Sequence, residues 1–401
     1  MTNERMRTEV VRTHPRTALL KPTTINSILT EVRALQAQGR NIVSLMRGEP
    51  DFSTPGHIVE AATRALHSGR TAYPDNRGEP ALREAIALKL SRDNGLSYSA
   101  GSEILVTDGA TLGIHAALMT LAGPGDDVLL PDPIYDAYQS PIKLAGANAC
   151  PVRSRCVQGR FAFGVEDLEA AWTPRSRVLL LNTPWNPVGT VFTRSELETI
   201  AGFVCRRNLT LISDEIYESI TYEGHQHLSP AAVSPELRER CVLVNSLSKS
   251  YAMPGWRLGY CAAPQDILQS MLLVLQQSSR GPATFVQDAG VVALTGPQDC
   301  VEQMRAAYAG RRQAVTEALS GLAAIEVYPP EGGFFTIVDV RRSGRGSDDV
   351  RRLLLNEYGL AVVHGRAYGE AGEGMLRVSF ASGGDTLARG LQLLRDGLAS
   401  L

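Results

Sequence analysis

A lysine lies among hydroxyl side chains in the stretch "SLSKSYAMPGWRLGY", which covers residues 246–260. Ser246 and Ser248 precede Lys249, and Arg257 follows it. Hydroxyl and guanidinium groups are the donors that a phosphate group needs, whereas a lysine amine can form a covalent bond with an aldehyde. This stretch therefore predicts a site in which a reactive lysine lies beside a bound phosphate.

Two further segments carry polar groups at the ends of predicted strands. Asp214 closes the apolar run "LTLIS", and a carboxylate in a sheet crevice is costly unless a cation or a strong donor pairs with it. A protonated heterocyclic nitrogen would be a suitable partner. Asn186 in "NTPWNPVG" and Tyr217 in "SDEIY" can hydrogen-bond a phenolate-type oxygen. These groups predict contacts with three different parts of one ligand.

A fourth segment, "TDGATLGIHAALM", changes from a predicted strand to a predicted helix at Gly109, Ala110 and Thr111. Small residues at a helix start let backbone N–H groups approach an anion, and the helix dipole favours a phosphate there. Tyr135 in "PDPIYDAY" can stack on a flat ligand. Together, these groups suit a ligand that is a planar, phosphorylated heterocycle with an aldehyde, a phenolic oxygen and a ring nitrogen. Pyridoxal 5'-phosphate has all of these groups.

Strand-like and helical runs alternate from about residue 100, and they must position these groups. The order predicts an α/β fold with a mainly parallel sheet flanked by helices on both faces, and ligands bind beyond the carboxyl ends of such strands. After about residue 283 the pattern indicates a smaller α+β domain. The sequence predicts an N-terminal segment of residues 1–50 that contributes to the small domain, a large cofactor-binding domain of residues 51–283, and a small C-terminal domain of residues 284–401.

Composition excludes several other classes of protein. The formal net charge of the 401 residues is −2, which gives no electrostatic reason to expect nucleic acid or an anionic membrane as partner. The cysteines form no C-x-x-C pair, and no G-x-x-x-x-G-K-[ST] or strand-linked G-x-G-x-x-G motif is present. A secretory signal and a membrane span are not apparent in the sequence. We expect a cytoplasmic protein with small-molecule partners.

The combined motifs resemble the class I/II aminotransferase family of fold type I pyridoxal-phosphate enzymes. The resemblance runs from "LMRGEPDFSTP" (45–55) through "YPDNRGEPALREAI" (73–86) to "MLRVSF" (375–380). It implies that Lys249 is the Schiff-base lysine, that Asp214 pairs with the pyridine nitrogen, and that Asn186 and Tyr217 hold the phenolic oxygen. The phosphate would be bound by Ser246, Ser248, Arg257 and the start of the helix at residues 109–111, with Tyr135 stacked on the ring.

The same resemblance implies a substrate site and a homodimer. Arg377 matches the arginine that binds the substrate α-carboxylate, with Gly48 and Asn186 beside it. Tyr73 matches the tyrosine that reaches the phosphate of the neighbouring subunit's cofactor. The implied reaction moves the amino group of an amino acid to a 2-oxo acid by a ping-pong mechanism. Because the same ring chemistry supports elimination, cyclisation or oxidation of an amino acid, a specialised enzyme of secondary metabolism stays as the alternative.

Three positions depart from the usual pattern of the family. Trp185 places an indole where relatives often have a smaller or polar residue, so we include it among the expected substrate contacts. His364 replaces a frequent proline, and Thr111 stands where an aspartate-preferring branch has lysine. These departures argue against a dedicated aspartate enzyme if the side chains line the site. Arg280, near the predicted domain junction, is a further candidate for contact with a substrate side chain.

Overall fold

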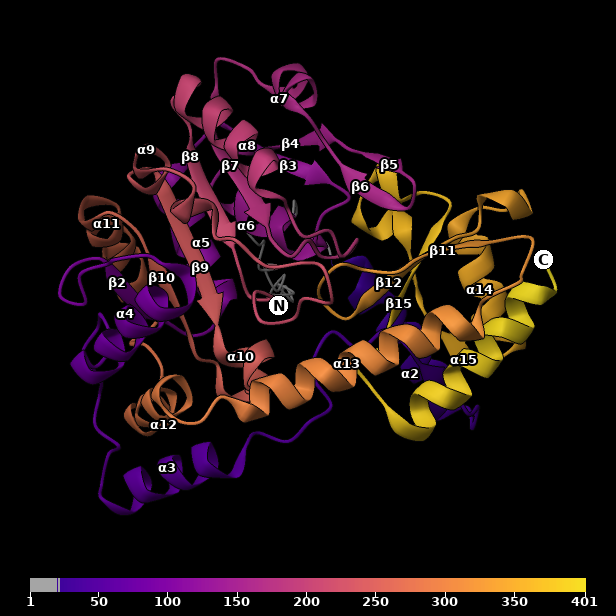
Figure 1. Cartoon of the computed structure of the whole chain (residues 1–401), viewed down its shortest axis with the longest axis horizontal. Helices are drawn as coiled ribbons and strands as arrows, with labels where there is room; N and C mark the ends of the chain where they lie inside the picture. The colour runs from indigo at the N-terminus through magenta and orange to yellow at the C-terminus, as the bar shows by residue number, and fades with distance from the viewer. Residues whose placement is uncertain (1–19, 21) are drawn as a thin grey trace, which may run out of the picture.

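A computed structural model describes residue 20 and residues 22–401 of the chain. Residues 1–19 and 21, which are part of the predicted N-terminal segment, lie outside the described residues. Two sheets dominate the architecture, and a long helix, α13 (Asp299–Ala318), runs between the regions that contain them (Figure 1). The fold is thus α/β with a second, smaller α+β region, as the sequence predicts.

The larger sheet has seven strands in the order β2-β10-β9-β8-β7-β3-β4, and all are parallel except β10, which is antiparallel to both of its neighbours. The strands are β2 (Ile104–Thr107), β3 (Asp127–Asp132), β4 (Asn148–Arg153), β7 (Ser176–Asn182), β8 (Thr210–Asp214), β9 (Cys241–Ser246) and β10 (Gly259–Ala262). This arrangement confirms the predicted mainly parallel sheet and adds one antiparallel strand within it.

Both faces of the larger sheet are buried, because successive side chains of a strand point to opposite faces. Leu179 and Leu181 of β7 pack into one hydrophobic cluster, whereas Val178 and Leu180 pack into another. The first cluster includes α4 (Pro80–Asn94) and α8 (Arg194–Arg206), and the second includes α5 (Ala110–Leu121) and α11 (Gln265–Gln276). Shorter helices, α6 (Gln139–Leu144), α7 (Val165–Ala171) and α9 (Pro235–Arg238), complete the cover.

The smaller sheet is antiparallel, in the order β11-β12-β15-β14. Its strands are β11 (Glu326–Tyr328), β12 (Phe335–Asp339), β14 (Val363–His364) and β15 (Met375–Ser379), and it lies with α14 (Ser347–Glu357) and α15 (Gly384–Ala399). The N-terminal segment joins this region, since β1 (Val43–Ser44) pairs in parallel with β13 (Leu360–Ala361). Helix α2 (Thr24–Ala37) precedes β1, and its buried Ile28 and Val32 pack with Leu355 and Val363.

Helix α12 (Thr284–Thr295) bears on where the two domains divide. It packs against α3 (Gly56–His67) and α4, and its buried Val286 and Ala289 belong to the cluster under the larger sheet. This packing favours a division between α12 and α13, slightly after the predicted one at residues 283 and 284. We propose that boundary for the two domains.

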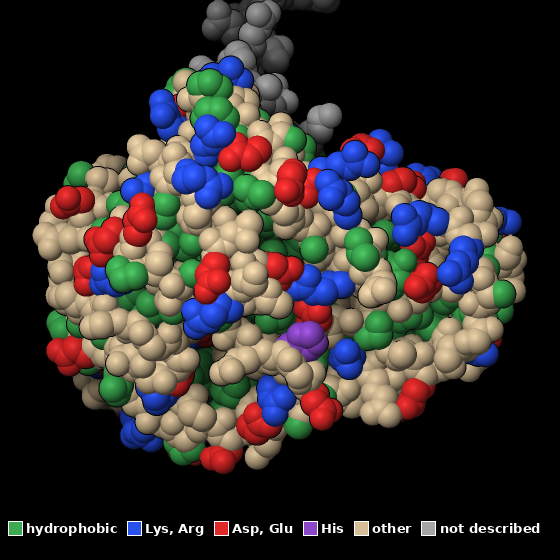
Figure 2. All heavy atoms as spheres, turned by 45° about the horizontal axis from the view of Figure 1, so that its top comes forward, with side chains coloured by type: hydrophobic (Ala, Val, Ile, Leu, Met, Phe, Trp, Pro, Cys, Tyr) green, Lys and Arg blue, Asp and Glu red, His purple; other side chains and the backbone are tan. Residues whose placement is uncertain are grey.

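The surface carries both signs of charge. Figure 2 shows acidic and basic side chains interspersed over the visible face, in keeping with the formal net charge of −2. No helix within residues 22–401 combines the length and the apolar character needed to cross a membrane.

Candidate active site

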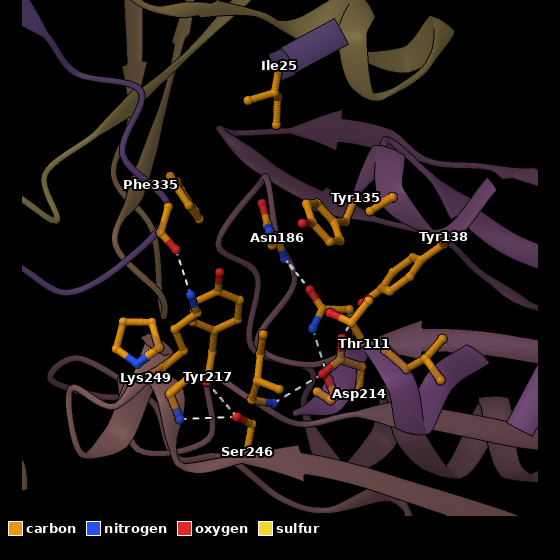
Figure 3. Close-up of a pocket in the computed structure, with 18 of the residues that line it drawn as sticks. Ile25, Thr111, Tyr135, Tyr138, Asn186, Asp214, Tyr217, Ser246, Lys249 and Phe335 are labelled. Carbon is orange, nitrogen blue, oxygen red and sulfur yellow. Dashed lines mark hydrogen bonds between the residues drawn. The ribbon is translucent and has the colours of Figure 1, made fainter. Parts of the chain in front are cut away.

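A cavity of about 250 Å3 lies beyond the carboxyl ends of β7, β8 and β9, where the larger sheet meets β12 and β15 (Figure 3). Parallel sheets place their ligand sites at this edge. Most of the residues that the sequence singled out line this one cavity. They are Gly48, Ala110, Thr111, Tyr135, Asn186, Asp214, Tyr217, Ser246, Ser248, Lys249, Arg257 and Arg377.

Asp214, the last residue of β8, is only 2% exposed and lines the inner wall of the cavity. Its carboxylate accepts hydrogen bonds from the Tyr138 hydroxyl and from the backbone N–H of Ile216. Burial raises the pKa of Asp214 to about 6, although the bond from Tyr138 opposes this shift. A buried carboxylate of this kind is stabilised by a cationic ligand group. Tyr138, whose hydroxyl contributes directly to this site, was not predicted from the sequence.

Lys249 lies in α10 (Leu247–Ser250), a single turn that follows β9 without a break. The Ser246 side chain caps this turn by accepting a hydrogen bond from the backbone N–H of Ser248. The Lys249 ammonium donates to the carbonyl oxygen of Gly48 at 2.6 Å. Burial lowers the pKa of Lys249 to about 8, which increases the share of neutral, nucleophilic amine near neutral pH.

A group of donors gathers around the first turn of α5. Gly109 precedes this helix with φ +80°, and a Cβ at that position would lie 2.6 Å from a guanidinium nitrogen of Arg257. Arg257 itself has φ +55° and donates to the carbonyl oxygens of Pro254 and Asp108. The hydroxyls of Ser246 and Ser248 hydrogen-bond each other at 2.8 Å. Hydroxyls, a guanidinium and a helix N-terminus together form a suitable cradle for a phosphate.

Asn186 and Tyr217 line the cavity between Asp214 and Arg377. The backbone N–H of Asn186 donates to the Asn182 side chain at 2.7 Å, and that side chain in turn donates to the Asp214 carbonyl at 2.9 Å. These bonds tie the loop after β7 to the end of β8. The Tyr217 ring packs edge-on against Phe334, with ring centroids 5.4 Å apart. Both polar groups are therefore held in place by the surrounding fold.

Arg377, in the middle of β15, is buried with its guanidinium between two aromatic rings. Its Cζ lies 4.0 Å from the Phe335 ring centroid and 4.9 Å from that of Tyr368. One terminal nitrogen donates to the carbonyl oxygen of Met46 at 3.2 Å, and Nε has no hydrogen-bond partner among the described residues. A buried N–H without a partner is costly, and a ligand carboxylate would satisfy it.

Several predicted residues lie elsewhere. Gly109 borders the cavity through its neighbours Ala110 and Arg257, and Tyr73 is 88% exposed on the surface. Trp185 is 1% exposed in the core of the larger domain, where its indole stacks on Phe192 and its N–H donates to the Pro133 carbonyl at 2.8 Å. This packing takes Trp185 away from the cavity, so we leave it out of the proposed substrate site.

His364 and Arg280 also lie apart from the cavity. His364 lies on β14, with its Nε2 3.9 Å from an Asp348 carboxylate oxygen, and Arg280 is exposed after α11. Neither residue lines the cavity beside Lys249 in this chain. Among the departures from the family pattern, Thr111 does line the cavity.

The residues that are present fit pyridoxal 5'-phosphate. The phosphate cradle, the buried carboxylate of Asp214 and the amine of Lys249 correspond to the phosphate, the ring nitrogen and the aldehyde of that cofactor. Arg377 lines the same cavity as Lys249 and has a guanidinium N–H without a partner among the described residues, which a carboxylate could satisfy. Fold and site together define the class of lysine-dependent pyridoxal-phosphate enzymes.

Comparisons with known proteins agree. The family described as aminotransferase class I and II matches residues 40–391. The aspartate aminotransferase of Geobacillus stearothermophilus is 36% identical over 377 residues, which are 93% of this chain and 95% of that enzyme. Aromatic-amino-acid aminotransferase 2 of Thermococcus litoralis is 37% identical over 358 residues, 88% of this chain and 91% of the relative.

A solved structure extends the agreement to the whole fold. The aspartate aminotransferase of Rhizobium meliloti superposes with a TM-score of 0.93 at 32% identity, and the match covers 97% of this chain and 99% of that one. The chain belongs to the class I and II aminotransferase family. It is a pyridoxal-phosphate-dependent enzyme that transfers amino groups, which confirms the predicted fold, cofactor and enzyme class.

Proposed function

We propose that Lys249, Asp214 and Arg377 carry out amino-group transfer from an α-amino acid to a 2-oxo acid. The observation that carries this proposal is their convergence on one cavity from three separate elements, α10, β8 and β15. Each offers a different function: a nucleophile and base, a buried anion, and a carboxylate donor. A site with only one of these groups would not support the reaction.

Lys249 acts twice in this proposal. Its neutral amine, favoured by the pKa of about 8, would hold the cofactor through the aldehyde group until the substrate amine takes its place. The freed amine would then act as the base that takes the proton from the substrate α-carbon and carries it as the Lys249 ammonium. Pyridoxal phosphate, when bound, supplies the electron-withdrawing ring that accepts the charge left at this carbon. The 2.6 Å bond to the Gly48 carbonyl holds the amine at the cavity wall.

Asp214 and Arg377 orient the two reactants. The Asp214 carboxylate, held by Tyr138, favours the protonated form of the ring nitrogen, because an opposite charge stabilises the cation. Arg377 receives the substrate α-carboxylate, and its position between Phe335 and Tyr368 prevents the guanidinium from turning. Fixing the carboxylate fixes which bond at the α-carbon faces Lys249. Asn186 and Tyr217 would hold the phenolic oxygen of the cofactor, and Tyr135 would lie against its ring.

We also propose that the enzyme works as a homodimer in the cytoplasm. Tyr73, which resembles the family's intersubunit tyrosine, is 88% exposed, as expected for a side chain that another subunit covers. A symmetric dimer would place each Tyr73 at the other subunit's phosphate cradle. Sedimentation of the active enzyme tests this, and a fully active monomer would contradict it.

The visible absorbance of the purified enzyme tests the reaction itself. Addition of amino acids should convert the cofactor spectrum to that of the pyridoxamine form, and a 2-oxo acid should restore the original spectrum. Ammonia release without such recovery would favour the alternative of an elimination, cyclisation or oxidation enzyme. Each half of the experiment tests one half of the ping-pong cycle.

A further inference from the structure

The cavity has a second end, formed by side chains from segments far apart in the sequence. Ile25 of α2, Met46 and Phe335 of β12 line this end, which we call the apolar end. In Figure 3, Ile25 and Phe335 lie on the side of the cavity away from Ser246 and Asp214, and the Ile25 side chain points inward from α2. None of these three side chains has a role in the cofactor binding described above.

The apolar end adjoins the place where a substrate side chain must lie. Arg377 lies against the Phe335 ring at 4.0 Å and donates to the Met46 carbonyl, while Lys249 donates to the carbonyl of Gly48. A substrate with its carboxylate on Arg377 and its α-carbon beside Lys249 therefore lies along residues 46–48. A side chain on that carbon would then lie near Met46 and Phe335, since both residues line the cavity and contact Arg377.

The distribution of cations argues against an acidic side chain. Among the described residues that line the cavity, the lysines and arginines are Lys249, Arg257 and Arg377. All three already have functions, toward the cofactor aldehyde, its phosphate and the substrate α-carboxylate. Within one subunit, the described residues of the cavity thus offer no further cation to a second substrate carboxylate, and burying that group without a counter-ion is strongly unfavourable.

The apolar end opens into a groove of about 860 Å3 between α2 and the start of α15. Leu29, one helical turn after Ile25, continues the apolar surface into this groove. Arg47 of this groove pairs with Glu49 at 3.3 Å, and Arg389 lies on the same helix as Asp385. The remaining cation of the groove is Lys249, the reactive amine of the site. The groove gives a large side chain room to extend without selecting for an acidic tip.

We propose that this enzyme prefers amino acids with large apolar side chains, aliphatic or aromatic, over aspartate and glutamate, and that Ile25 is a specificity-determining residue. The proposal rests on the amino-transfer function proposed above, and it assigns the substrate class of that same site. It also sets this chain apart from the relatives named for aspartate, which it otherwise resembles over most of its length.

A single-turnover panel tests the preference. The holoenzyme is mixed with leucine, methionine, phenylalanine, aspartate or glutamate without a 2-oxo acid, and the second-order rate of cofactor conversion is measured for each. We expect the best apolar substrate to exceed both acidic ones by at least about tenfold, since burying a fitting side chain is favourable and an unpaired carboxylate is not. Equal or faster conversion by aspartate overturns the proposal.

Variants on α2 then test the role of Ile25. Ile25→Arg places a cation in the apolar end and should shift the phenylalanine-to-aspartate rate ratio toward aspartate by at least about tenfold. Ile25→Leu should keep the wild-type ratio. Ala34→Arg adds the same charge to an exposed position of the same helix and serves as the matched control. An equal shift in Ala34→Arg, or none in Ile25→Arg with a normal cofactor spectrum, overturns the assignment.

Failure of the two proposals would look different. If no amino acid changes the cofactor spectrum reversibly, the amino-transfer proposal itself fails. If aspartate or glutamate gives the fastest reversible conversion, amino transfer stands and only the preference for apolar side chains fails.

Discussion

The two ends of the active-site cavity are built differently. At the cofactor end, polar groups lie at the tips of neighbouring strands and hold one another, as when Ser246 bonds Ser248 and Tyr138 bonds Asp214. At the apolar end, Ile25 comes from α2, Met46 from the segment that follows β1, and Phe335 from β12. None of these three side chains offers a strong hydrogen-bonding group. The first end holds the groups that fit the cofactor, whereas the second is the part of the cavity that we propose to select the substrate, apart from the groups that carry the chemistry.

The largest effect is expected where the two ends meet, at Lys249. Lys249→Ala should lower the turnover rate by about 10^4-fold, because it removes both the nucleophile and the base. The phosphate cradle is unchanged in this variant, so cofactor should still bind noncovalently. Absorbance spectra and a steady-state transamination assay measure the two quantities. Substantial residual turnover would show that another group acts as the base.

A smaller loss is expected at Asp214, deep in the cofactor end. Asp214→Asn removes the anion that favours a protonated ring nitrogen and should lower kcat by about 10^2- to 10^3-fold. The same substitution should also change how the stability of the cofactor-free protein depends on pH. Because the pKa of Asp214 is raised to about 6, its stabilising contribution is complete below its ordinary pKa of 3.8 and is lost as the pH rises through 6.

The stability effect at Asp214 can be measured by urea unfolding of the cofactor-free forms. The wild-type protein should lose about 2 kcal/mol relative to Asp214→Asn between pH 4 and pH 7. Pairing with a protonated ring nitrogen should abolish that loss in the holoenzyme. A constant difference across this pH range would contradict the raised pKa.

Cofactor uptake should report the lowered pKa of Lys249. The neutral amine is the reactive form, so the rate at which cofactor-free enzyme captures pyridoxal phosphate should rise about tenfold from pH 7 to pH 9 and level off above about pH 9. Stopped-flow absorbance provides the measurement. A rate that continues to rise up to pH 10 would indicate an ordinary, solvated lysine.

Tyr138→Phe should have a modest effect that stays within the cofactor end. Loss of a hydrogen bond to a buried carboxylate costs about 1 to 3 kcal/mol, so kcat should fall by about tenfold. Since that bond lowers the pKa of Asp214, the acidic limb of the pH–rate profile should move toward higher pH. The ratio of rates for apolar and acidic substrates should stay the same. A change in that ratio would show that the cofactor end also affects substrate choice.

The smallest effect on catalysis is expected at Trp185. Trp185→Phe removes the N–H bond to Pro133 and leaves a space beside Phe192, which should lower the free energy of unfolding by about 1 to 3 kcal/mol. Substrate rate ratios should change by less than about threefold, because the indole does not line the cavity. A larger change in the rate ratios with normal stability would indicate that Trp185 contacts the substrate after all.

The cofactor end was largely predictable from the sequence. Lys249, Asp214 and Asn186 each follow an apolar strand within a short, contiguous motif, and parallel strands bring such ends to one edge of the sheet. Tyr138 was missed because its bond to Asp214 joins the segment after β3 to β8, and β7 lies between these strands. That adjacency depends on the order of strands in the sheet, which local patterns do not encode.

The apolar end was not predictable, for a related reason. Ile25 and Phe335 are ordinary hydrophobic residues in amphipathic or buried segments, and only the docking of α2 and β12 beside Lys249 brings them together. Trp185 illustrates the opposite error, since its place inside a ligand-binding motif suggested a ligand contact while its side chain turned into the core. Proximity along the chain gave no information about side-chain direction there.

The carbonyl groups of Met46 and Gly48 each accept a hydrogen bond from a cation of the site, Arg377 and Lys249 respectively. The backbone of residues 46–48 therefore sets the spacing between the Arg377 guanidinium and the Lys249 amine. Its length matters more than its composition, because the contacts come from backbone atoms. Inserting or deleting a single residue between these positions would misalign the two cations, even though every side chain of the cavity were kept.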